Sequence, residues 1–468
     1  MVDRLLVDLA ADGRASVASW LDGDDFPGTG EPFDLTWPLD ADAIEDLRWY
    51  LEDYLVAPFG VYGERGPAVQ ARLADWGVAV FNALFGAGPA RDAYVKLRAR
   101  SDMVKLVFRS SSPELLGRPW ELMRDPGRPT PLSLELAGVS RSLPTADLAD
   151  TLPVPGGKLR VLMVISRPAG GQDVGYQMIA RPLLRRLEAV RGEVDLVVLR
   201  PPTLDVLEEA LGEAAARGEP YQVVHFDGHG VLRRADVGGG YGTNMFAGQA
   251  SEGVLAFGKP GGGADDVTAS KNAQVPVVVL NACQSGAIGQ DLGAAIATRL
   301  LQEGTASVVA MAYSVYAVAA AEFMAAFYER LFAGDPVSAA VAAGRQRMFT
   351  SDRRPSPKGE MPLADWLIPV HYLRRDVSFP QARTERSGLP SLGQALDQLR
   401  ATTAGDGSED LDPVGVFTGR DALFYELEAA ARLGRVVILH GPGGTARPSW
   451  PRHSAGGGGI PAGWSSRN

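Results

Sequence analysis

Cys283 and His229 are the two residues of this sequence whose types and positions could do covalent chemistry together. Cys283 ends the apolar run VPVVVLNAC, and His229 ends an earlier apolar run, YQVVHFDGH, between Gly228 and Gly230. An imidazole that takes the proton from a thiol leaves a thiolate, which is the nucleophile of a cysteine peptidase. The pair therefore predicts hydrolysis of peptide bonds, provided that the fold brings the two residues together.

The segments that carry the two residues have the pattern of buried parallel strands. Each is short, rich in β-branched residues and closed by glycine. From residue 158 onward, predicted strands alternate with predicted helices; the strands are at 158–166, 193–200, 221–230 and 275–283. A glycine-rich segment and a hairpin, in place of a helix, precede the last of these strands. This alternation is typical of parallel βαβ units with right-handed crossovers. Because such sheets bind ligands at the carboxyl ends of their strands, we expect His229 and Cys283 to lie there.

The amino-terminal region shows other patterns. Residues 1–25 predict a hairpin that turns at Asp12-Gly13. Apolar residues at helical spacing follow within 40–55, behind a capping Asp40, and again within 67–86. We therefore interpret residues 1–105 as a mostly helical amino-terminal region.

Several motifs resemble those of the CHAT family of caspase-like proteins. The motif HFDGHG stands at residues 225–230 and the motif ACQSG at 282–286, each at the end of an apolar strand pattern. PWEL at 119–122 precedes them, and the helix-strand pattern 292–313 and the segment 327–348 follow. The order and spacing of these motifs carry the resemblance, which extends over about residues 40–375.

The resemblance implies a caspase-like α/β fold, a mainly parallel sheet flanked by helices. It also implies that His229 is the catalytic histidine and Cys283 the nucleophile. The backbone N–H groups of Gly230 and Cys283 are the expected oxyanion donors. One departure is Asp227, which stands where the family usually has a small residue; we expect it to lie on the opposite face from His229 and to take no part in catalysis. Another is Tyr313, where the family often has tryptophan.

The expected activity is that of a gated cysteine endopeptidase which cleaves a protein or peptide substrate, in bacterial signalling or defence. Asp291, Asp265 and Asp266 are candidates for a specificity pocket that takes a basic substrate residue, although acids in such positions more often lie on a solvated surface. The loop 233–245 could gate the cleft, and a regulatory partner is expected. The alternative is a signalling scaffold with a silent dyad, coupled to an NTPase module.

Composition excludes several other functions. A net charge of −10 and a pI near 5.2 argue against nucleic-acid binding as the main role. One cysteine and five scattered histidines form no metal motif, and we expect neither a metal nor another cofactor. The acidic amino terminus is not a signal peptide, and the uncharged segment 306–321 is too polar to span a membrane, so we expect a cytoplasmic protein without membrane contact.

The sequence divides into five predicted parts. The helical region 1–105 precedes the caspase-like domain 106–376, a linker at 377–412 with one helix, a P-loop NTPase start at 413–445, and a disordered tail at 446–468. The NTPase start ends in GPGGTARP, without the Lys-Ser/Thr pair that a P-loop needs, and should not bind ATP. Either the tail is native or a frame shift has produced it. Back-translation favours the frame shift, because one added base restores GPGGTGKT.

Overall fold

The computed structural model describes residues 2–101, 103–148, 152–154, 159–166, 194–234, 251–258, 264–267, 275–283 and 289–380. For residues 152, 229–234, 251–254, 258, 264–267, 282–283, 289–293 and 317 it describes the backbone alone. The predicted NTPase start, the tail and most of the linker lie outside the described residues, as do residues 235–245 of the predicted gating loop. These predictions stay predictions.

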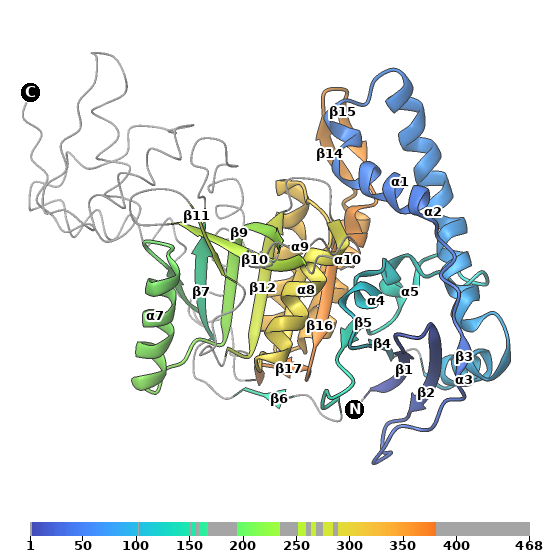
Figure 1. The fold of residues 1–468 in the computed structure, drawn as a ribbon, viewed down its shortest axis with the longest axis horizontal. Helices are drawn as coiled ribbons and strands as arrows, with labels where there is room; N and C mark the ends of the chain where they lie inside the picture. The colour runs from blue at the N-terminus through green and yellow to red at the C-terminus, as the bar shows by residue number, and fades with distance from the viewer. Residues whose placement is uncertain are drawn as a thin grey trace, which may run out of the picture.

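One large sheet runs through the molecule and is built from two parallel halves (Figure 1). In the half that we name the site half, the strands are parallel in the order β8-β7-β9-β12-β13. In the other half, the order β16-β5-β4-β1 is again parallel. The two halves meet where β13 pairs with β16 in antiparallel fashion. The α/β class and the large, mostly parallel sheet are thus confirmed.

The strands of the site half coincide with the apolar runs of the sequence. Antiparallel strands β10 and β11 extend this half beyond β9. The bounds are β7 (Leu159–Ile165), β8 (Val194–Val198), β9 (Val223–Arg234), β10 (Ser251–Gly258), β11 (Ala264–Val267), β12 (Val277–Cys283) and β13 (Ser307–Met311).

The amino terminus begins with strands, which corrects the prediction of a mostly helical region. The predicted hairpin is present, with Gly13 at a positive φ of 87° in its turn. Its first strand then pairs in parallel with β4, so the hairpin is part of the main sheet. The bounds in this half are β1 (Asp3–Leu9), β2 (Arg14–Trp20), β3 (Phe33–Asp34), β4 (Val104–Arg109), β5 (Gly138–Ser142) and β16 (Pro369–Leu373).

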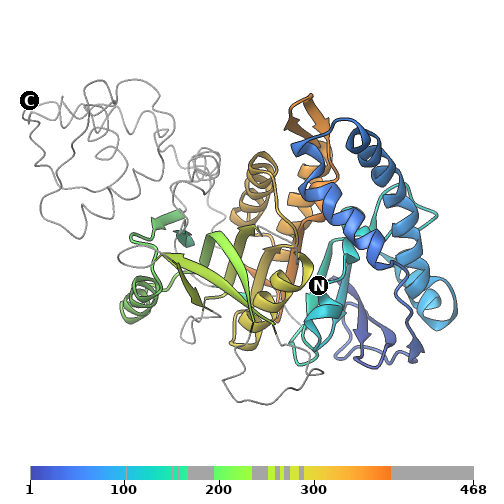
Figure 2. The same cartoon turned by 45° about the horizontal axis from the view of Figure 1, so that its top comes forward.

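Three helices follow the hairpin. The first two lie at the predicted places, and the third was not predicted. Helix α1 (Ala41–Glu52) begins at Asp40, whose carboxylate accepts a hydrogen bond of 2.8 Å from the Ala43 N–H. Helices α2 (Val61–Phe85) and α3 (Gly88–Arg100) come next. The hairpin of β14 (Arg353–Ser356) and β15 (Gly359–Pro362) lies beside α1 and α2 (Figures 1 and 2), and the Ala364 N–H bonds to the Tyr50 hydroxyl at 3.2 Å.

Helices cover both faces of the site half. On one face, side chains of α7 (Leu204–Ala216) and α8 (Gly289–Gln302) pack over β9 and β12. On the other face, Tyr328 of α9 (Ala317–Phe332) contacts His225 of β9. Helix α10 (Val337–Thr350) packs closely on α9, because a Cβ on Gly344 would lie 2.4 Å from the Phe323 ring.

Short elements complete the chain. They are η1 (Tyr54–Val56), α4 (Pro113–Gly117), η2 (Trp120–Leu122), α5 (Leu132–Glu135), β6 (Leu152–Pro153), η5 (Asp365–Leu367) and β17 (Val377–Ser378). Within the described parts of the chain, none of the helices combines the length and the apolar character needed to cross a membrane.

Candidate active site

The strands β9 and β12 bring the backbones of His229 and Cys283 next to each other. The two strands pair in parallel from Val223 opposite Val277 onward, and the final pair of this ladder is His229 opposite Cys283. Neighbouring strands lie about 4.8 Å apart, so the two residues start from adjacent backbone positions. The register thus joins residues 54 positions apart in the sequence, while the roles of the two side chains stay predictions.

We had expected His229 to end its strand, but the strand continues beyond it. Strand β9 continues to Arg234, and its neighbour on the side away from β12 changes. Residues 223–227 pair with β7 in parallel, whereas residues 229–234 pair with β10 in antiparallel fashion. Gly228 stands between the two ladders. The histidine therefore lies where β12 ends and β10 takes over from β7.

Ser166 stabilises the backbone where β9 changes its partner strand from β7 to β10. Its N–H donates to the Asp227 carbonyl at 2.8 Å, and its hydroxyl donates to the Ala256 carbonyl of β10 at 2.8 Å. Gly228 must be glycine here, because a Cβ would lie 2.7 Å from the Phe226 ring and 3.1 Å from the Ser166 carbonyl oxygen. The backbone around the histidine is thus held from both sides.

The pair that precedes His229 and Cys283 in the register is Asp227 and Asn281. Both side chains are 1% exposed, and the Asn281 amide donates to the Asp227 carboxylate at 3.0 Å. Alternate residues of a strand share one face of the sheet, so Asp227 and His229 lie on the same face. This corrects the expectation that Asp227 belongs to the opposite face.

One step further down the strand, His225 is fully buried. Its Nδ1 forms a hydrogen bond of 2.9 Å with the Tyr328 hydroxyl. Burial lowers the pKa of His225 to about 4, so the ring is neutral at neutral pH. Among the described residues, neither His225 Nε2 nor Asn281 Oδ1 has a hydrogen-bond partner.

The backbone register separates the three candidate specificity acids. Asp266 of β11 is opposite Ala256 of β10, and Ala256 is opposite His229. Asp266, Ala256, His229 and Cys283 therefore form one row across four strands, which we name the dyad row. Asp265 lies one position further along β11, opposite Phe257, and Asp291 lies in the first turn of α8. Their roles, and that of Gly230 opposite Leu255, stay predictions.

An amino-terminal helix reaches the carboxyl side of the sheet, a contact that sequence patterns gave no sign of. The Glu52 carboxylate at the end of α1 accepts a hydrogen bond of 2.8 Å from the Ser314 N–H, just after β13. Arg48 holds the same carboxylate at 3.0 Å. Tyr313, where the family often has tryptophan, is 3% exposed. Helix α1 thus holds the loop that follows β13, the strand next to β12, by a hydrogen bond.

Two of the motifs that pointed to the family meet in a buried ion cluster. Glu121 of PWEL binds Arg141 through both carboxylate oxygens, at 2.5 and 2.7 Å, and binds Arg345 of α10 at 2.8 Å. Burial would raise the pKa of Glu121, but the charges of Arg141 and Arg345 lower it below its usual value. We name these three residues the glutamate cluster. It joins α10 to β5 and η2.

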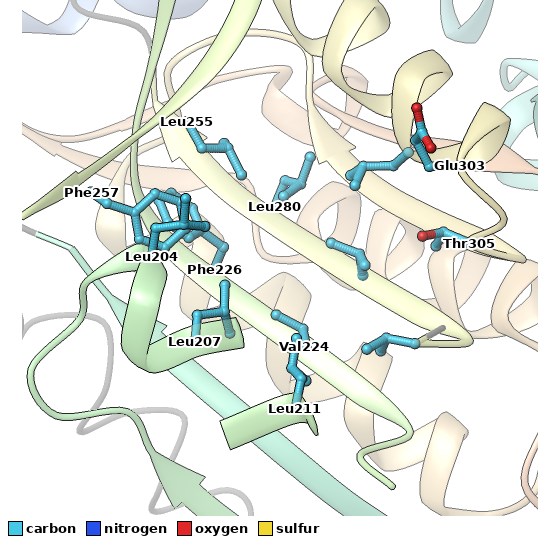
Figure 3. Close-up of a pocket in the computed structure, with 13 residues that line it drawn as sticks. Leu204, Leu207, Leu211, Val224, Phe226, Leu255, Phe257, Leu280, Glu303 and Thr305 are labelled. Atoms are coloured by element: carbon cyan, nitrogen blue, oxygen red, sulfur yellow. The ribbon is translucent and has the colours of Figure 1, made fainter. Parts of the chain in front are cut away.

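An apolar pocket of about 70 Å³ lies on the opposite face of β9 and β12 (Figure 3). Val224 and Phe226 of β9 and Leu280 of β12 line it, alternating along the strands with His225, Asp227 and Asn281. Its polar lining residues are Glu303 and Thr305. The pocket is therefore part of the core beneath α7 and α8 and is separate from the dyad row. Within the described residues, no three His, Cys, Asp or Glu side chains gather closely enough to hold a metal ion.

Comparisons with known proteins agree with the residue patterns. Residues 75–387 match the model of the CHAT domain, which covers more than half of the chain. A search among curated proteins found no match. Two crystal structures of the Saccharomyces cerevisiae separase–securin complex, at 3.0 and 2.6 Å resolution, are similar at 12% and 10% identity, with TM-scores of 0.46 and 0.40. Each match covers 81% of this chain, which spans about 30% of the length of those chains. On the family match, this chain belongs to the CHAT domain family.

Proposed function

We propose that this chain is a caspase-like cysteine endopeptidase whose dyad is Cys283 and His229. Membership of the CHAT family supports the proposal. The observation that carries it is the parallel ladder of β9 and β12, whose last pair is His229 opposite Cys283. A thiol and an imidazole at adjacent positions of two paired strands are the minimum that nucleophilic hydrolysis of a peptide bond requires.

The reaction follows from these two groups. His229 takes the proton from the Cys283 thiol, and the thiolate attacks the peptide carbonyl carbon. The backbone N–H groups of Gly230 and Cys283 stabilise the oxyanion that forms. His229 then protonates the leaving amine, and water hydrolyses the thioester with His229 again as the base. No cofactor takes part in this sequence of steps.

The dyad row favours Asp266 over Asp265 and Asp291 as the acid that receives a basic substrate residue. Its support is the shared register of Asp266, Ala256 and His229. The substrate is a protein or a peptide, and a regulatory partner controls its access in the cytoplasm. On this account, the segment 413–445 is the start of an NTPase module to which the caspase-like domain is coupled.

Peptidyl acyloxymethyl ketones test the proposal, because they alkylate a thiolate only after they occupy a substrate site. We expect a probe that ends in arginine to label Cys283, with a probe that ends in aspartate labelling it more slowly. His229→Ala should abolish both reactions. Since Cys283 is the one cysteine of the chain, intact mass identifies the labelled residue.

The labelling is carried out on the purified chain and in a lysate of the cells that produce it naturally, so that a regulatory partner is present. If the wild type and His229→Ala react alike in both samples, the dyad is silent and the scaffold function replaces the peptidase. If the aspartate probe reacts faster than the arginine probe, the dyad stands and the role of Asp266 is wrong.

A further inference from the structure

Asp227 occupies a position from which a carboxylate can act on His229. It lies two residues before His229 on β9, as Asn281 lies two residues before Cys283 on β12. The two pairs therefore follow each other on one face of the sheet, separated by about 6.6 Å along the strands. An aspartate and a histidine side chain can together span this separation.

The Asp227 carboxylate is fixed in place. The Asn281 amide donates to its Oδ1 at 3.0 Å, and both side chains are 1% exposed. The Ser166 N–H also holds the Asp227 carbonyl at 2.8 Å. Because these two side chains are shielded from water, the charge of Asp227 acts on its neighbours more strongly than a charge at the surface does.

In the neighbouring strands β7 and β12, the register partners on this face carry no charge. Ile165 of β7 is the register partner of Asp227, and Met163 and Val279 are the register partners of His225. His225 itself is neutral at neutral pH, because burial lowers its pKa to about 4. Beyond β10, Asp266 of β11 belongs to the dyad row and stands two strands away from His229.

The charged residues of α9, which packs on this face, are engaged elsewhere. Glu322 pairs with Arg347 of α10 at 2.8 Å, and Glu329 and Arg330 are exposed. Tyr328 reaches the face, where it bonds to His225, and burial raises its pKa above the usual value. It is therefore uncharged.

We infer that Asp227 is a positioning residue for His229: its carboxylate, held by Asn281, orients the imidazole and stabilises the imidazolium that faces the Cys283 thiolate. The inference rests on the proposed function. When the thiol proton moves to the imidazole, Asp227 keeps its negative charge and takes up no proton. An opposite charge at this range raises the pKa of a histidine. The dyad of this chain thus works with a third residue, which the sequence motif alone does not require.

The pH dependence of Cys283 alkylation by iodoacetate tests this role. An anionic reagent reacts faster beside an imidazolium, so the alkaline limb of its rate profile reports the pKa of His229. Asp227→Asn keeps an acceptor for the Asn281 amide but removes the charge. We expect it to move the alkaline limb down by about one pH unit and to slow alkylation at neutral pH by about tenfold. Asp195→Asn is the matched control, because Asp195 pairs with Arg160 on β7 and β8; its profile should superimpose on that of the wild type.

Each outcome decides a separate point. If His229→Ala reacts like the wild type, the proposed function fails. If His229→Ala is slow while Asp227→Asn superimposes on the wild type, the dyad stands and the role of Asp227 is overturned. Should Asp227→Asn not fold, as judged by circular dichroism, Asn281→Ala takes its place: it frees the carboxylate, and an unchanged alkaline limb then contradicts the inference.

Discussion

The glutamate cluster differs from the buried polar side chains behind the dyad row, those of His225 and Asn281, in how completely the polar atoms are hydrogen-bonded. In the glutamate cluster, all three guanidinium nitrogens of Arg141 and of Arg345 have acceptors. Behind the dyad row, His225 Nε2 and Asn281 Oδ1 have none among the described residues. Native cores satisfy nearly all of their buried polar groups, and exceptions gather at functional sites.

This difference separates two kinds of family motif. PWEL and the segment around Arg345 supply a satisfied ion cluster, which fixes α10 against the sheet. HFDGHG and the first two residues of ACQSG lie on the two strands that contribute His229 and Cys283 to the dyad row. Both kinds of motif identify the family, but we attribute chemistry to the second kind alone.

The largest expected effect is the loss of the glutamate cluster. Glu121→Ala leaves Arg141 and Arg345 buried without their carboxylate, which should lower the free energy of unfolding by about 3–5 kcal/mol. Urea denaturation measures this change. Arg347→Ala is the control, because Arg347 lies on α10 together with Arg345. It breaks a half-exposed pair with Glu322 and should lower the free energy of unfolding by less than about 1 kcal/mol. Equal losses in the two variants would contradict the structural role of the cluster.

Acidification should weaken the fold through two buried neutral histidines. Burial lowers the pKa of His225 to about 4 and that of His371 to about 3. Because the unfolded chain takes up protons near pH 6.5, their contribution is complete above that pH and declines as the pH falls. By pH 5 each histidine should cost about 2 kcal/mol.

Urea denaturation between pH 8 and pH 5 measures this loss. His225→Gln should be less stable than the wild type at pH 8, and the gap should narrow by about 2 kcal/mol at pH 5. If the difference in free energy of unfolding between the wild type and His225→Gln stayed constant over this range, His225 would not be buried in its neutral form. The contrast between the glutamate cluster and the polar groups next to the dyad row would then no longer hold for His225.

A smaller effect should follow from removing one hydroxyl. Tyr328→Phe leaves His225 Nδ1 without its bond of 2.9 Å and should cost about 1–2 kcal/mol. Tyr316→Phe is the matched control, because the Tyr316 hydroxyl is buried without a partner among the described residues. Thermal unfolding should show no loss for Tyr316→Phe. A loss as large as that of Tyr328→Phe would show that hydrogen-bond completeness does not govern stability here.

Local patterns predicted the elements well, and their long-range pairing less well. The hairpin turn at Gly13, the Asp40 cap and the strands of the site half follow from short-range rules of turns, caps and alternation. The pairing of β1 with β4 joins residues about 100 positions apart, and no local pattern encodes it. The salt bridges of Glu121 to Arg141 and Arg345 are equally non-local. The face of Asp227, in contrast, follows from strand alternation and could have been predicted.

The most direct test of the central claim is the rate at which iodoacetamide alkylates Cys283 at pH 7. An unactivated thiol is only a few per cent thiolate at this pH, whereas a thiol paired with imidazole is largely ionised. The account predicts that His229→Ala slows alkylation of the folded chain by about tenfold or more. Equal rates in the wild type and in His229→Ala would show that His229 does not activate Cys283, and the peptidase account would be wrong.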